Sequence, residues 1–341
     1  MLALGWHPAG DTLMLPSTMR AITIAGPGGP EQLVPVVRPL PVPGGRELLI
    51  AVEYAGVNRH DAGQRRRGHP PAGATDIPGL EVSGTVVATG EAVTRVGIGD
   101  RVCALVNGGG YAPYCLADER TTLPLPPGFG MREAAALPEA LYTLWHNLIE
   151  LCAIAPGDWL LVHGGTSGVG SIGMAFARWL GARPVATCGS DDKCAVALSM
   201  GALAACNYQR DDFVPWIAEV TGGHGADVIL DMAGGTYAVR NLQALALDGR
   251  ITHLTGAIEP AYHVPLELLM RKRARVTGSL LRPLSIERKA RITEGLLARL
   301  WPQMAGLIVP RIDHEFSLDE AVAAHQRLER GEAIGKILLR P

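Results

Sequence analysis

The order of apolar and polar residues divides the chain into two regions with different periodicities. From residue 19 to about 137, short apolar or alternating runs are separated by turns rich in glycine and proline. Alternation with a period of two is typical of half-buried strands, and glycine and proline mark the turns between them. This region is therefore predicted to be an antiparallel barrel or sandwich-like domain. Its clearest strand candidates are residues 20–24, 47–54, 82–88 and 101–105.

From about residue 138 the pattern changes to alternating helix and strand. Apolar stripes with helical spacing fill the intervals between short apolar runs, and Gly181 and Gly201 stand where glycines end helices. This alternation predicts parallel strands joined by covering helices, so the fold class is α/β, with a six-stranded, doubly wound sheet. The tail from about residue 280 has the order helix, strand, helix, strand and is predicted to fold back onto the first domain. Strands are predicted at 159–163, 184–187, 205–207, 227–232, 250–255 and 275–278, and helices at 169–180, 191–200 and 237–246.

A glycine-rich loop follows the first of these strands directly and opens into a helix. The segment from His163 to Gly170 has the sequence H-G-G-T-S-G-V-G. Glycines allow a tight turn and bring backbone N–H groups close to phosphate oxygens at a helix N-terminus. A bare glycine string would be a weak signal, but between a strand and a helix it predicts a dinucleotide site. The candidate cofactor-binding residues here are Gly165, Thr166, Ser167, Gly168, Val169 and Gly170.

The end of the next strand indicates which nicotinamide cofactor binds. NAD-dependent enzymes usually place a carboxylate there to bind the ribose 2′-hydroxyl, but residues 188–190 of this chain are Cys-Gly-Ser. Asp191 and Asp192 follow and could serve that purpose. We prefer the interpretation in which Ser190 caps a helix and the two acids complement the helix dipole. Lys193 then lies one turn into the helix, suited to a 2′-phosphate, so the sequence favours NADPH.

Composition and charge narrow the classes of function. The chain has 341 residues, 48% of them hydrophobic, and a formal net charge of −2, which is enough for two domains with sizeable cores. A balanced charge without a basic stripe interleaved with aromatics argues against nucleic acid or a membrane surface as a partner. Six cysteines without C-x-x-C pairs predict reduced thiols in a cytoplasmic protein. Residues 1–18 carry no evident export signal and are interpreted as an N-terminal extension, and no apolar stretch has the length of a membrane span.

Eight segments carry a family resemblance, and they occur in the order of that family. They are A-G-V-N-R-H-D (55–61), I-P-G-L-E-V-S-G (77–84), G-I-G-D-R-V (97–102), A-A-A-L-P-E-A (134–140), H-G-G-T-S-G-V-G (163–170), N-Y-Q-R-D-D-F (207–213), A-D-V-I-L-D-M-A-G-G (226–235) and I-G-K-I-L-L (334–339). The chain resembles the zinc-independent quinone oxidoreductase branch of the medium-chain dehydrogenase/reductase superfamily, the relatives of zeta-crystallin. Within that branch it is most similar to the tumour-suppressor-inducible quinone reductase subfamily. The resemblance implies a GroES-like β-rich catalytic domain, residues 19–137 and 280–341, and a Rossmann NADPH-binding domain, residues 138–279.

The resemblance also bears on zinc. Zinc-dependent relatives have a cysteine where Asn58 stands and a histidine where Leu80 stands, just before Glu81, and this chain has no cysteine-rich loop for a structural zinc. A catalytic zinc needs about three converging protein ligands. We therefore expect no metal, and we expect Glu81 to be a structural hydrogen-bonding residue. Without a Lewis acid the substrate must accept hydride readily, as quinones and C=C bonds conjugated to a carbonyl do.

The resemblance implies roles for residues around the nicotinamide. Asn58 is expected to polarise the substrate oxygen; the alternative is that it is only a turn residue after a strand. Thr143 is expected near the nicotinamide; the alternative is that its hydroxyl only bonds the backbone of its own helix. His69 stands where relatives often carry a pocket tyrosine. It is either a hydrogen-bond donor or general acid, or an exposed loop residue. The cofactor-binding residues expected beyond the glycine loop are Gly189, Ser190, Lys193, Tyr208, Gly234, Leu254, Gly256 and Leu280.

Three functions remain open at the level of the sequence. The first is an NADPH-dependent quinone reductase. The second is a reductase of activated C=C bonds in enones or enoyl thioesters, although the missing tyrosine weighs against thioesters. The third is a crystallin-like NADPH-binding protein without turnover, because binding and catalysis share the same loop. The resemblance also implies a homodimer that pairs through the edge strand of the cofactor domain, near residues 250–278.

Overall fold

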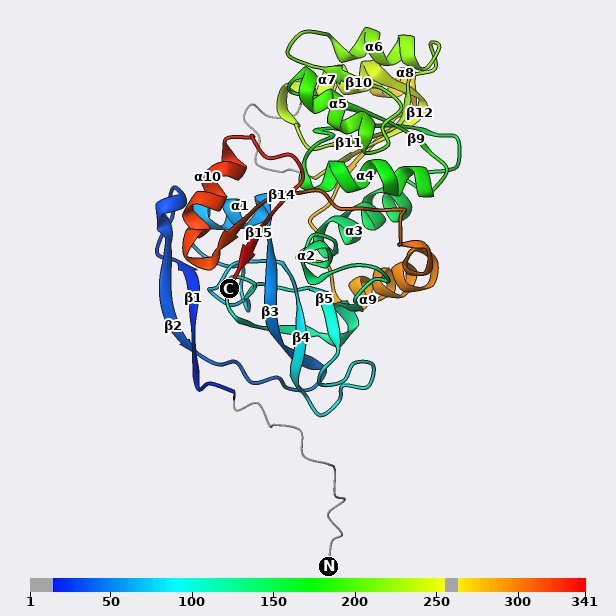
Figure 1. Ribbon diagram of the computed structural model, residues 1–341. Helices are drawn as coiled ribbons and strands as arrows, with labels where there is room; N and C mark the ends of the chain where they lie inside the picture. The colour runs from blue at the N-terminus through cyan, green and yellow to red at the C-terminus, as the bar shows by residue number, and fades with distance from the viewer. Residues whose placement is uncertain (1–14, 255–262) are drawn as a thin grey trace, which may run out of the picture.

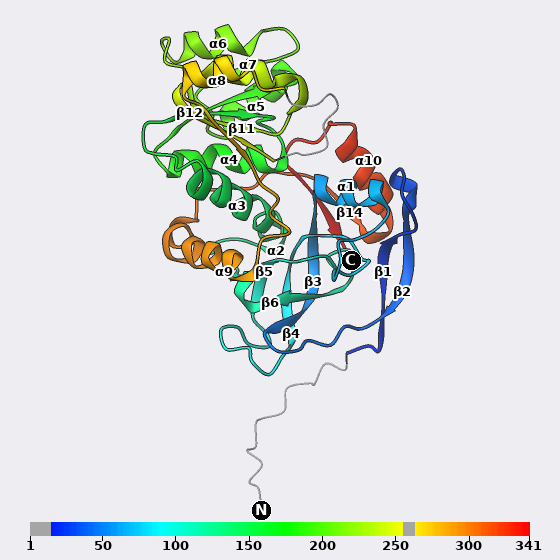
Figure 2. The same ribbon diagram turned by 180° about the vertical axis from the view of Figure 1, so that it is seen from behind.

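Two lobes, each built around its own β-sheet, make up the protein (Figure 1). The computed structural model describes residues 15–254 and 263–341. One lobe holds the N-terminal strands, drawn in blue and cyan, and the other holds the middle of the chain, drawn in green and yellow. The C-terminal segment, drawn in orange and red, returns to the first lobe, as the reverse view also shows (Figure 2).

The first lobe is a mainly antiparallel β domain completed by the end of the chain. Its seven-stranded sheet has the order β14-β15-β3-β4-β5-β7, with β6 paired to β3, while β1 and β2 form a separate antiparallel pair. Because β15 pairs with β3, the predicted return of the tail to the first domain is confirmed. The strands are β1 (Thr18–Ile24), β2 (Leu33–Pro39), β3 (Glu47–Val57), β4 (Glu81–Thr89), β5 (Arg101–Leu105), β6 (Tyr114–Asp118), β7 (Thr122–Pro124), β14 (Ile312–Ser317) and β15 (Lys336–Arg340), and the helices are α1 (Arg59–Arg67), α2 (Met131–Ala134) and α10 (Ala321–Glu329).

The second lobe is a six-stranded parallel sheet with the order β10-β9-β8-β11-β12-β13. Counted along the chain, this is the order 3-2-1-4-5-6 of a Rossmann fold, so the predicted fold class is confirmed. The direction of winding reverses beside β8, and ligands of such sheets bind at the carboxyl ends of the strands there. Its elements are β8 (Trp159–His163), α4 (Gly168–Trp179), β9 (Arg183–Cys188), α5 (Asp191–Ser199), β10 (Ala205–Asn207), α6 (Phe213–Val220), β11 (Ala226–Asp231), α7 (Ala238–Ala244), β12 (Leu245–His253), α8 (Leu266–Lys272) and β13 (Arg275–Gly278).

The fifth strand of this sheet begins earlier than its apolar pattern predicts. The predicted helix over 237–246 ends at Ala244 as α7, and β12 follows without a loop, whereas a strand is predicted only from 250. Leu245 and Ala246 continue the apolar stripe of the helix, but they are buried as strand residues. A short apolar run does not distinguish these two environments, which explains the wrong boundary.

One apolar cluster joins the two lobes. It combines Cys103 of β5 with Met174 of α4 and Leu296, which follows α9. The helices that bridge the lobes are α3 (Pro138–Leu144) and α9 (Ile286–Gly295), and α3 packs against both α4 and α9. The glycine-rich loop and the first lobe are therefore held in one fixed arrangement.

Candidate active site

The glycine-rich loop leaves β8 at the carboxyl edge of the parallel sheet and starts α4. Ser167 caps this helix, because its Oγ accepts a hydrogen bond from Gly170 N at 3.0 Å. A Cβ on Gly170 would lie 2.3 Å from the Gly164 carbonyl oxygen, and one on Gly165 would lie 2.5 Å from the Ala186 Cβ. Any larger residue would push α4 away from β8 and β9. The first turn of α4 thus fits the pyrophosphate of a dinucleotide.

A chain of buried polar side chains holds the end of β8. His163 Nδ1 lies 2.9 Å from Thr187 Oγ1, and its Nε2 lies 2.8 Å from Asn241 Oδ1. Asn241 Nδ2 donates to Asp231 Oδ2 at 2.9 Å, and Asp231 Oδ1 accepts the Gly234 N–H at 2.8 Å. Burial lowers the pKa of His163, so the ring is neutral and accepts at one nitrogen while donating at the other. This chain fixes Gly234, at φ +63°, beside the glycine loop.

The predicted helix cap at the end of β9 is confirmed. Ser190 Oγ accepts a hydrogen bond from Lys193 N at 3.2 Å and begins α5. The Asp191 carboxylate is engaged by Arg210, whose Nη1 lies 3.0 Å from Asp191 Oδ2. Because this carboxylate already has a cationic partner, Asp191 is less suited to bind a ribose hydroxyl. This favours the interpretation in which Asp191 complements the dipole of α5.

Gly189, Tyr208 and Lys193, which are predicted to hold the adenosine end of a dinucleotide, lie close together after β9. The Tyr208 hydroxyl lies 2.8 Å from the place of a Cβ on Gly189, so the ring covers the glycine directly. Lys193 Nζ donates to the Gly331 carbonyl oxygen at 2.5 Å, just after α10 of the other lobe. An ammonium has three N–H donors, so this bond leaves two for a phosphate.

A buried lysine connects the glycine loop with the first lobe. Lys336 begins β15, and its Cδ lies 2.6 Å from the place of a Cβ on Gly168. Its ammonium forms an ion pair with Glu81 and donates to Asn58 Oδ1 at 2.8 Å. Asn58 Nδ2 donates in turn to Glu81 Oε1 at 2.9 Å, and the Lys336 and Glu81 side chains are 1% and 0% exposed. The expectation that Glu81 is a structural hydrogen-bonding residue is confirmed.

Both ends of the Asn58 amide are used within this cluster. Its Oδ1 accepts from Lys336, and its Nδ2 also lies 3.4 Å from the Gly56 carbonyl oxygen, besides donating to Glu81. Asn58 therefore orients the buried ion pair. Its action on a substrate oxygen stays a prediction.

The same cluster tests whether the zinc of the zinc-dependent relatives would fit here. Such a zinc needs about three thiolate, imidazole or carboxylate ligands that converge on one point. Here the carboxylate of Glu81 faces the ammonium of Lys336, and an amide stands at position 58. Within residues 15–254 and 263–341, no group of three or more His, Cys, Asp or Glu side chains could hold a metal ion. The residues at this position do not fit a catalytic zinc.

Glu139, which the sequence did not single out, adjoins the ion pair. Its N–H, in the first turn of α3, donates to Glu81 Oε2 at 2.9 Å. Burial, and after it the charge of Glu81, raise the pKa of the Glu139 carboxyl to about 8, and the charge of Lys336 opposes the rise. This carboxyl is therefore protonated at neutral pH.

Two further groups of the site, His60 and Arg282, were also missed. His60 follows Asn58 closely in α1, and burial together with the charge of Arg282 lowers its pKa to about 4. Arg282 lies between β13 and α9 and is buried. His60 and Glu139 belong to segments that carry the family resemblance, but their neighbours in space are distant in the sequence.

Two of the predicted catalytic residues, Thr143 and His69, form hydrogen bonds with residues close to them in the sequence. Thr143 is buried in α3, and its carbonyl oxygen accepts a hydrogen bond from Asn147 Nδ2 at 2.8 Å. His69 is exposed after α1, and its Nδ1 lies 3.2 Å from the carbonyl oxygen of Pro70. This geometry favours the exposed-loop interpretation of His69.

Of the remaining predicted cofactor residues, Leu254 and Leu280 lie at the same end of the parallel sheet. Leu254 N donates to the Asp231 carbonyl oxygen at 3.0 Å, which places it beside Gly234. Leu280 follows β13, and its side chain is 61% exposed. Gly256 lies outside the described residues.

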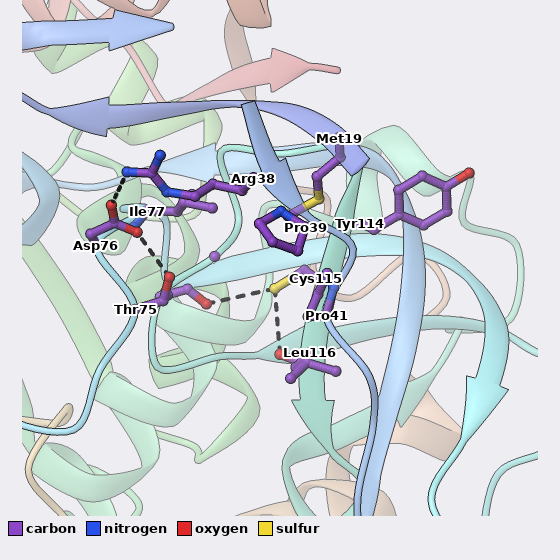
Figure 3. A pocket seen from close by; sticks show the side chains of 12 residues that line it. Met19, Arg38, Pro39, Pro41, Thr75, Asp76, Ile77, Tyr114, Cys115 and Leu116 are labelled. Carbon is purple, nitrogen blue, oxygen red and sulfur yellow. Dashed lines mark hydrogen bonds and ion pairs between the residues drawn. The ribbon is translucent and has the colours of Figure 1, made fainter. Parts of the chain in front are cut away.

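The cavity shown in Figure 3 is separate from this cluster. It has a volume of about 210 Å³ and lies between β1, the end of β2 and the loops that contain Thr75 and Gly108. An ion pair of 2.6 Å between Arg38 and Asp76 crosses its margin. None of the predicted site residues that the structure describes is among its lining side chains.

In the part of the chain that the structure describes, no helix has both the length and the apolar character needed to cross a membrane.

Comparison with known proteins agrees with the two lobes. The model of the alcohol dehydrogenase GroES-like domain matches residues 44–145, and that of the zinc-binding dehydrogenase family matches residues 168–296. A GroES-like domain joined to a Rossmann domain with a glycine-rich loop defines an oxidoreductase of the medium-chain dehydrogenase/reductase type. The zinc in the second family's description does not fit the residues found here.

Individual relatives narrow this class further. Quinone oxidoreductase-like protein 2 of Bos taurus is 31% identical over 301 residues, which cover 86% of this chain and 84% of that protein. A mycobacterial protein complexed with NADPH superposes with a TM-score of 0.85 at 30% identity over 95% of this chain and all of the other. Escherichia coli quinone oxidoreductase complexed with NADPH gives 0.82 at 26% identity over 94% of this chain and all of the other. The chain belongs to the quinone oxidoreductase branch of the medium-chain dehydrogenase/reductase superfamily.

Proposed function

We propose that this protein is an NADPH-dependent reductase that transfers hydride to quinones without zinc. The buried cluster of Asn58, Glu81 and Lys336 carries this proposal, because a lysine ammonium lies against the carboxylate that a metal would need. A site without a Lewis acid suits an acceptor that is already electrophilic. Quinones are such acceptors, since reduction makes their ring aromatic.

The residues of the second lobe fit NADPH. The loop from Gly165 to Gly170 would hold the pyrophosphate, and Gly189 and Tyr208 would flank the adenosine. Lys193 offers a cation to the 2′-phosphate. The NADPH complexes of the two structural neighbours support this choice. When bound, the nicotinamide supplies the hydride, and the protein supplies orientation and electrostatic stabilisation.

Reduction also needs a proton, and Glu139 is the group suited to supply it. Its carboxyl retains a proton up to a pH of about 8, and it interacts electrostatically with Glu81, Lys336 and Lys289. A general acid works best when its pKa lies near the working pH. After hydride transfer, the acceptor oxygen would take this proton, directly or through water.

The experiment that tests the proposal compares oxidation of NADPH and NADH by metal-stripped protein, with 9,10-phenanthrenequinone as acceptor. We expect turnover with a clear preference for NADPH, and no gain when zinc is restored. A short enone in place of the quinone is the matched comparison. Preference for the enone would assign the protein to the reductases of activated C=C bonds. NADPH binding, seen by fluorescence, without turnover on either acceptor would indicate a non-catalytic binding protein.

The homodimer expected from the family also belongs to this proposal. The strand β13 stands at the edge of the parallel sheet, and on α8 beside it the side chains of Leu266 and Met270 are 69% and 73% exposed. Pairing across this edge would cover both features. Light scattering should then give twice the chain mass of 36.1 kDa, and a monomer mass at working concentration would contradict the pairing.

A further inference from the structure

Arg282 is a second buried cation, and all its hydrogen-bond partners among residues 15–254 and 263–341 are neutral. Its Nε donates to Asn107 Oδ1 at 2.9 Å, and its Nη2 donates to the Asn107 carbonyl oxygen at 2.7 Å. Its Nη1 donates to Gln64 Oε1 at 2.5 Å and lies 3.4 Å from His60 Nε2. In the described ranges, no carboxylate oxygen lies within the 4.0 Å of an ion pair with this guanidinium.

Burying a guanidinium among neutral groups costs free energy unless an anion lies close enough to pair with it. Arg282 is 9% exposed, burial lowers its pKa, and the Asp61 carboxylate acts on it only through space. The Asp61 carboxylate already accepts the Asn58 N–H at 2.8 Å, and the Glu139 carboxyl is neutral at pH 7. Buried charges in proteins are normally paired, so a negatively charged ligand is the missing partner.

Gln64 gives a second and independent indication of a missing acceptor. Its side chain is 1% exposed, and its Nε2 has no hydrogen-bond partner among the residues that the structure describes. Its Oε1 is already bonded to Arg282. A buried amide without an acceptor is unfavourable, and an oxygen placed beside Nε2 would remove that cost.

These groups adjoin Asn58 and Leu280, two of the residues predicted to lie near the nicotinamide or the rest of the cofactor. Gln64 and His60 stand on α1, which begins directly after Asn58, and Arg282 lies two residues after Leu280, one of the predicted cofactor-binding residues. Lys289 Nζ donates to the Arg282 carbonyl oxygen at 2.8 Å, which fixes the backbone at this point.

Gly108 separates Arg282 from the cavity of Figure 3. A Cβ on Gly108 would lie 3.3 Å from Arg282 Nη2, and Gly108 also lines that cavity. The guanidinium therefore lies behind the wall of the cavity and is not one of its lining groups.

We propose that Arg282 and Gln64 bind the acceptor oxygen on which negative charge develops during hydride transfer. This assignment rests on the proposed function. In that reaction a C–H bond of the reduced nicotinamide breaks, and its hydrogen and two electrons pass to the acceptor. A new bond to hydrogen forms there, and the oxygen becomes a phenolate or enolate until it takes a proton from Glu139 or water. Because Arg282 has no carboxylate partner beforehand, its charge stabilises this oxyanion more than the neutral quinone.

The test uses 4-nitrophenol, whose phenol and phenolate forms absorb at different wavelengths, added to the protein with NADP⁺. Wild-type protein should bind the phenolate in preference to the phenol. Arg282→Gln should weaken phenolate binding by about tenfold to 100-fold, the range for a hydrogen bond to a charged group, and Arg282→Lys should retain part of it. Gln64→Glu is the decisive variant, because it keeps the size of the side chain but gives Arg282 a permanent carboxylate. It should remove phenolate binding although Arg282 is still present.

NADPH affinity, measured by fluorescence, separates this proposal from the proposed function. It should be the same in wild type, Arg282→Gln, Gln64→Glu and the control Arg20→Gln, which changes an exposed ion pair in the first lobe. Equal phenolate binding by all four proteins would overturn the assignment to Arg282, whatever the turnover with quinone. Binding of benzoate without binding of 4-nitrophenolate would also overturn it and would point to a carboxylate-bearing substrate. Phenolate binding that is lost in both variants would support the assignment even if no quinone were reduced.

Discussion

Replacing Lys336 with methionine tests the buried cluster on which the zinc-free site depends. Methionine keeps most of the length of the side chain but removes the ammonium, so the Glu81 carboxylate stays buried with only N–H donors from Asn58 and Glu139. Removing one partner of a buried ion pair costs about 3–5 kcal/mol, since the remaining charge is uncompensated. For a domain the size of the first lobe this lowers Tm by about 6–20 °C.

The assay is thermal unfolding of three variants beside wild type. Lys336→Met alone should show the full loss, and adding Glu81→Gln should restore much of it, because the unpaired charge is then gone. Arg20→Met is the matched control: its ion pair with Asp319 is exposed, with side chains 58% and 57% accessible, and it should change the free energy of unfolding by no more than about 1 kcal/mol. If Lys336→Met loses no more stability than Arg20→Met, or if Glu81→Gln gives no recovery, the cluster does not act as a buried ion pair.

Three further predictions concern the proton, the phosphate and the glycine loop. The pKa of Glu139 rises from 4.5 to about 8 on folding, so the native protein binds more protons than the unfolded chain between these values, and stability should fall as pH rises through that window. The rate with quinone should fall above about pH 8, and Glu139→Gln should remove that limb of the pH profile, whereas an unchanged profile would exclude Glu139 as the acid. Lys193→Ala should raise KM for NADPH more than KM for NADH by a factor equivalent to about 1–3 kcal/mol, and equal weakening of both would show that Lys193 does not bind the phosphate. Gly170→Val should abolish NADPH binding, because its Cβ would lie 2.3 Å from a backbone oxygen. Gly97→Ala should not, because a Cβ there would meet only Asp100 Oδ2, at an ordinary 3.8 Å; retained affinity in a folded Gly170→Val protein would place the loop elsewhere.

Features with a local physical cause were predictable from the sequence. The cap at Ser190 depends on one hydroxyl and the N–H three residues later, and the loop up to Gly170 depends on the contacts of adjacent turns. The same holds for the parallel, doubly wound arrangement of the six strands, because alternating helix and strand in one chain leaves few topologies. The predicted beginning of β12 was wrong, because Leu245 suits a helix or a strand and its burial is set by neighbours on β11.

The polar contacts around Asn58 and Arg282 were not predictable from the sequence in the same way. The Lys336 ammonium meets groups 255 and 278 positions earlier in the chain, and a lysine before an apolar strand would ordinarily be assigned to the surface. The family resemblance pointed to His69, and nothing in the sequence singled out His60. The structure places His60 half-buried beside Arg282 and leaves His69 exposed, because His69 follows the end of α1 at Arg67. Long-range pairing of polar groups is decided by the packing of the two lobes, which no local pattern reports.

The unusual sequence of the glycine loop and the buried side chain of Lys336 depend on each other. Ser167 stands where the common dinucleotide motif has a glycine, and it serves as the cap of α4; the glycine comes one position later, at Gly168. There it leaves the space through which the stem of Lys336 passes, since a Cβ would lie 2.6 Å from the lysine Cδ. The preceding residue, Gly335, donates its N–H to the Thr166 carbonyl oxygen at 2.8 Å, so the start of β15 is bonded to the loop itself. The loop proposed to hold the cofactor and the ion pair proposed to replace a metal thus share one strand, and a side chain at position 168 would disturb both at once.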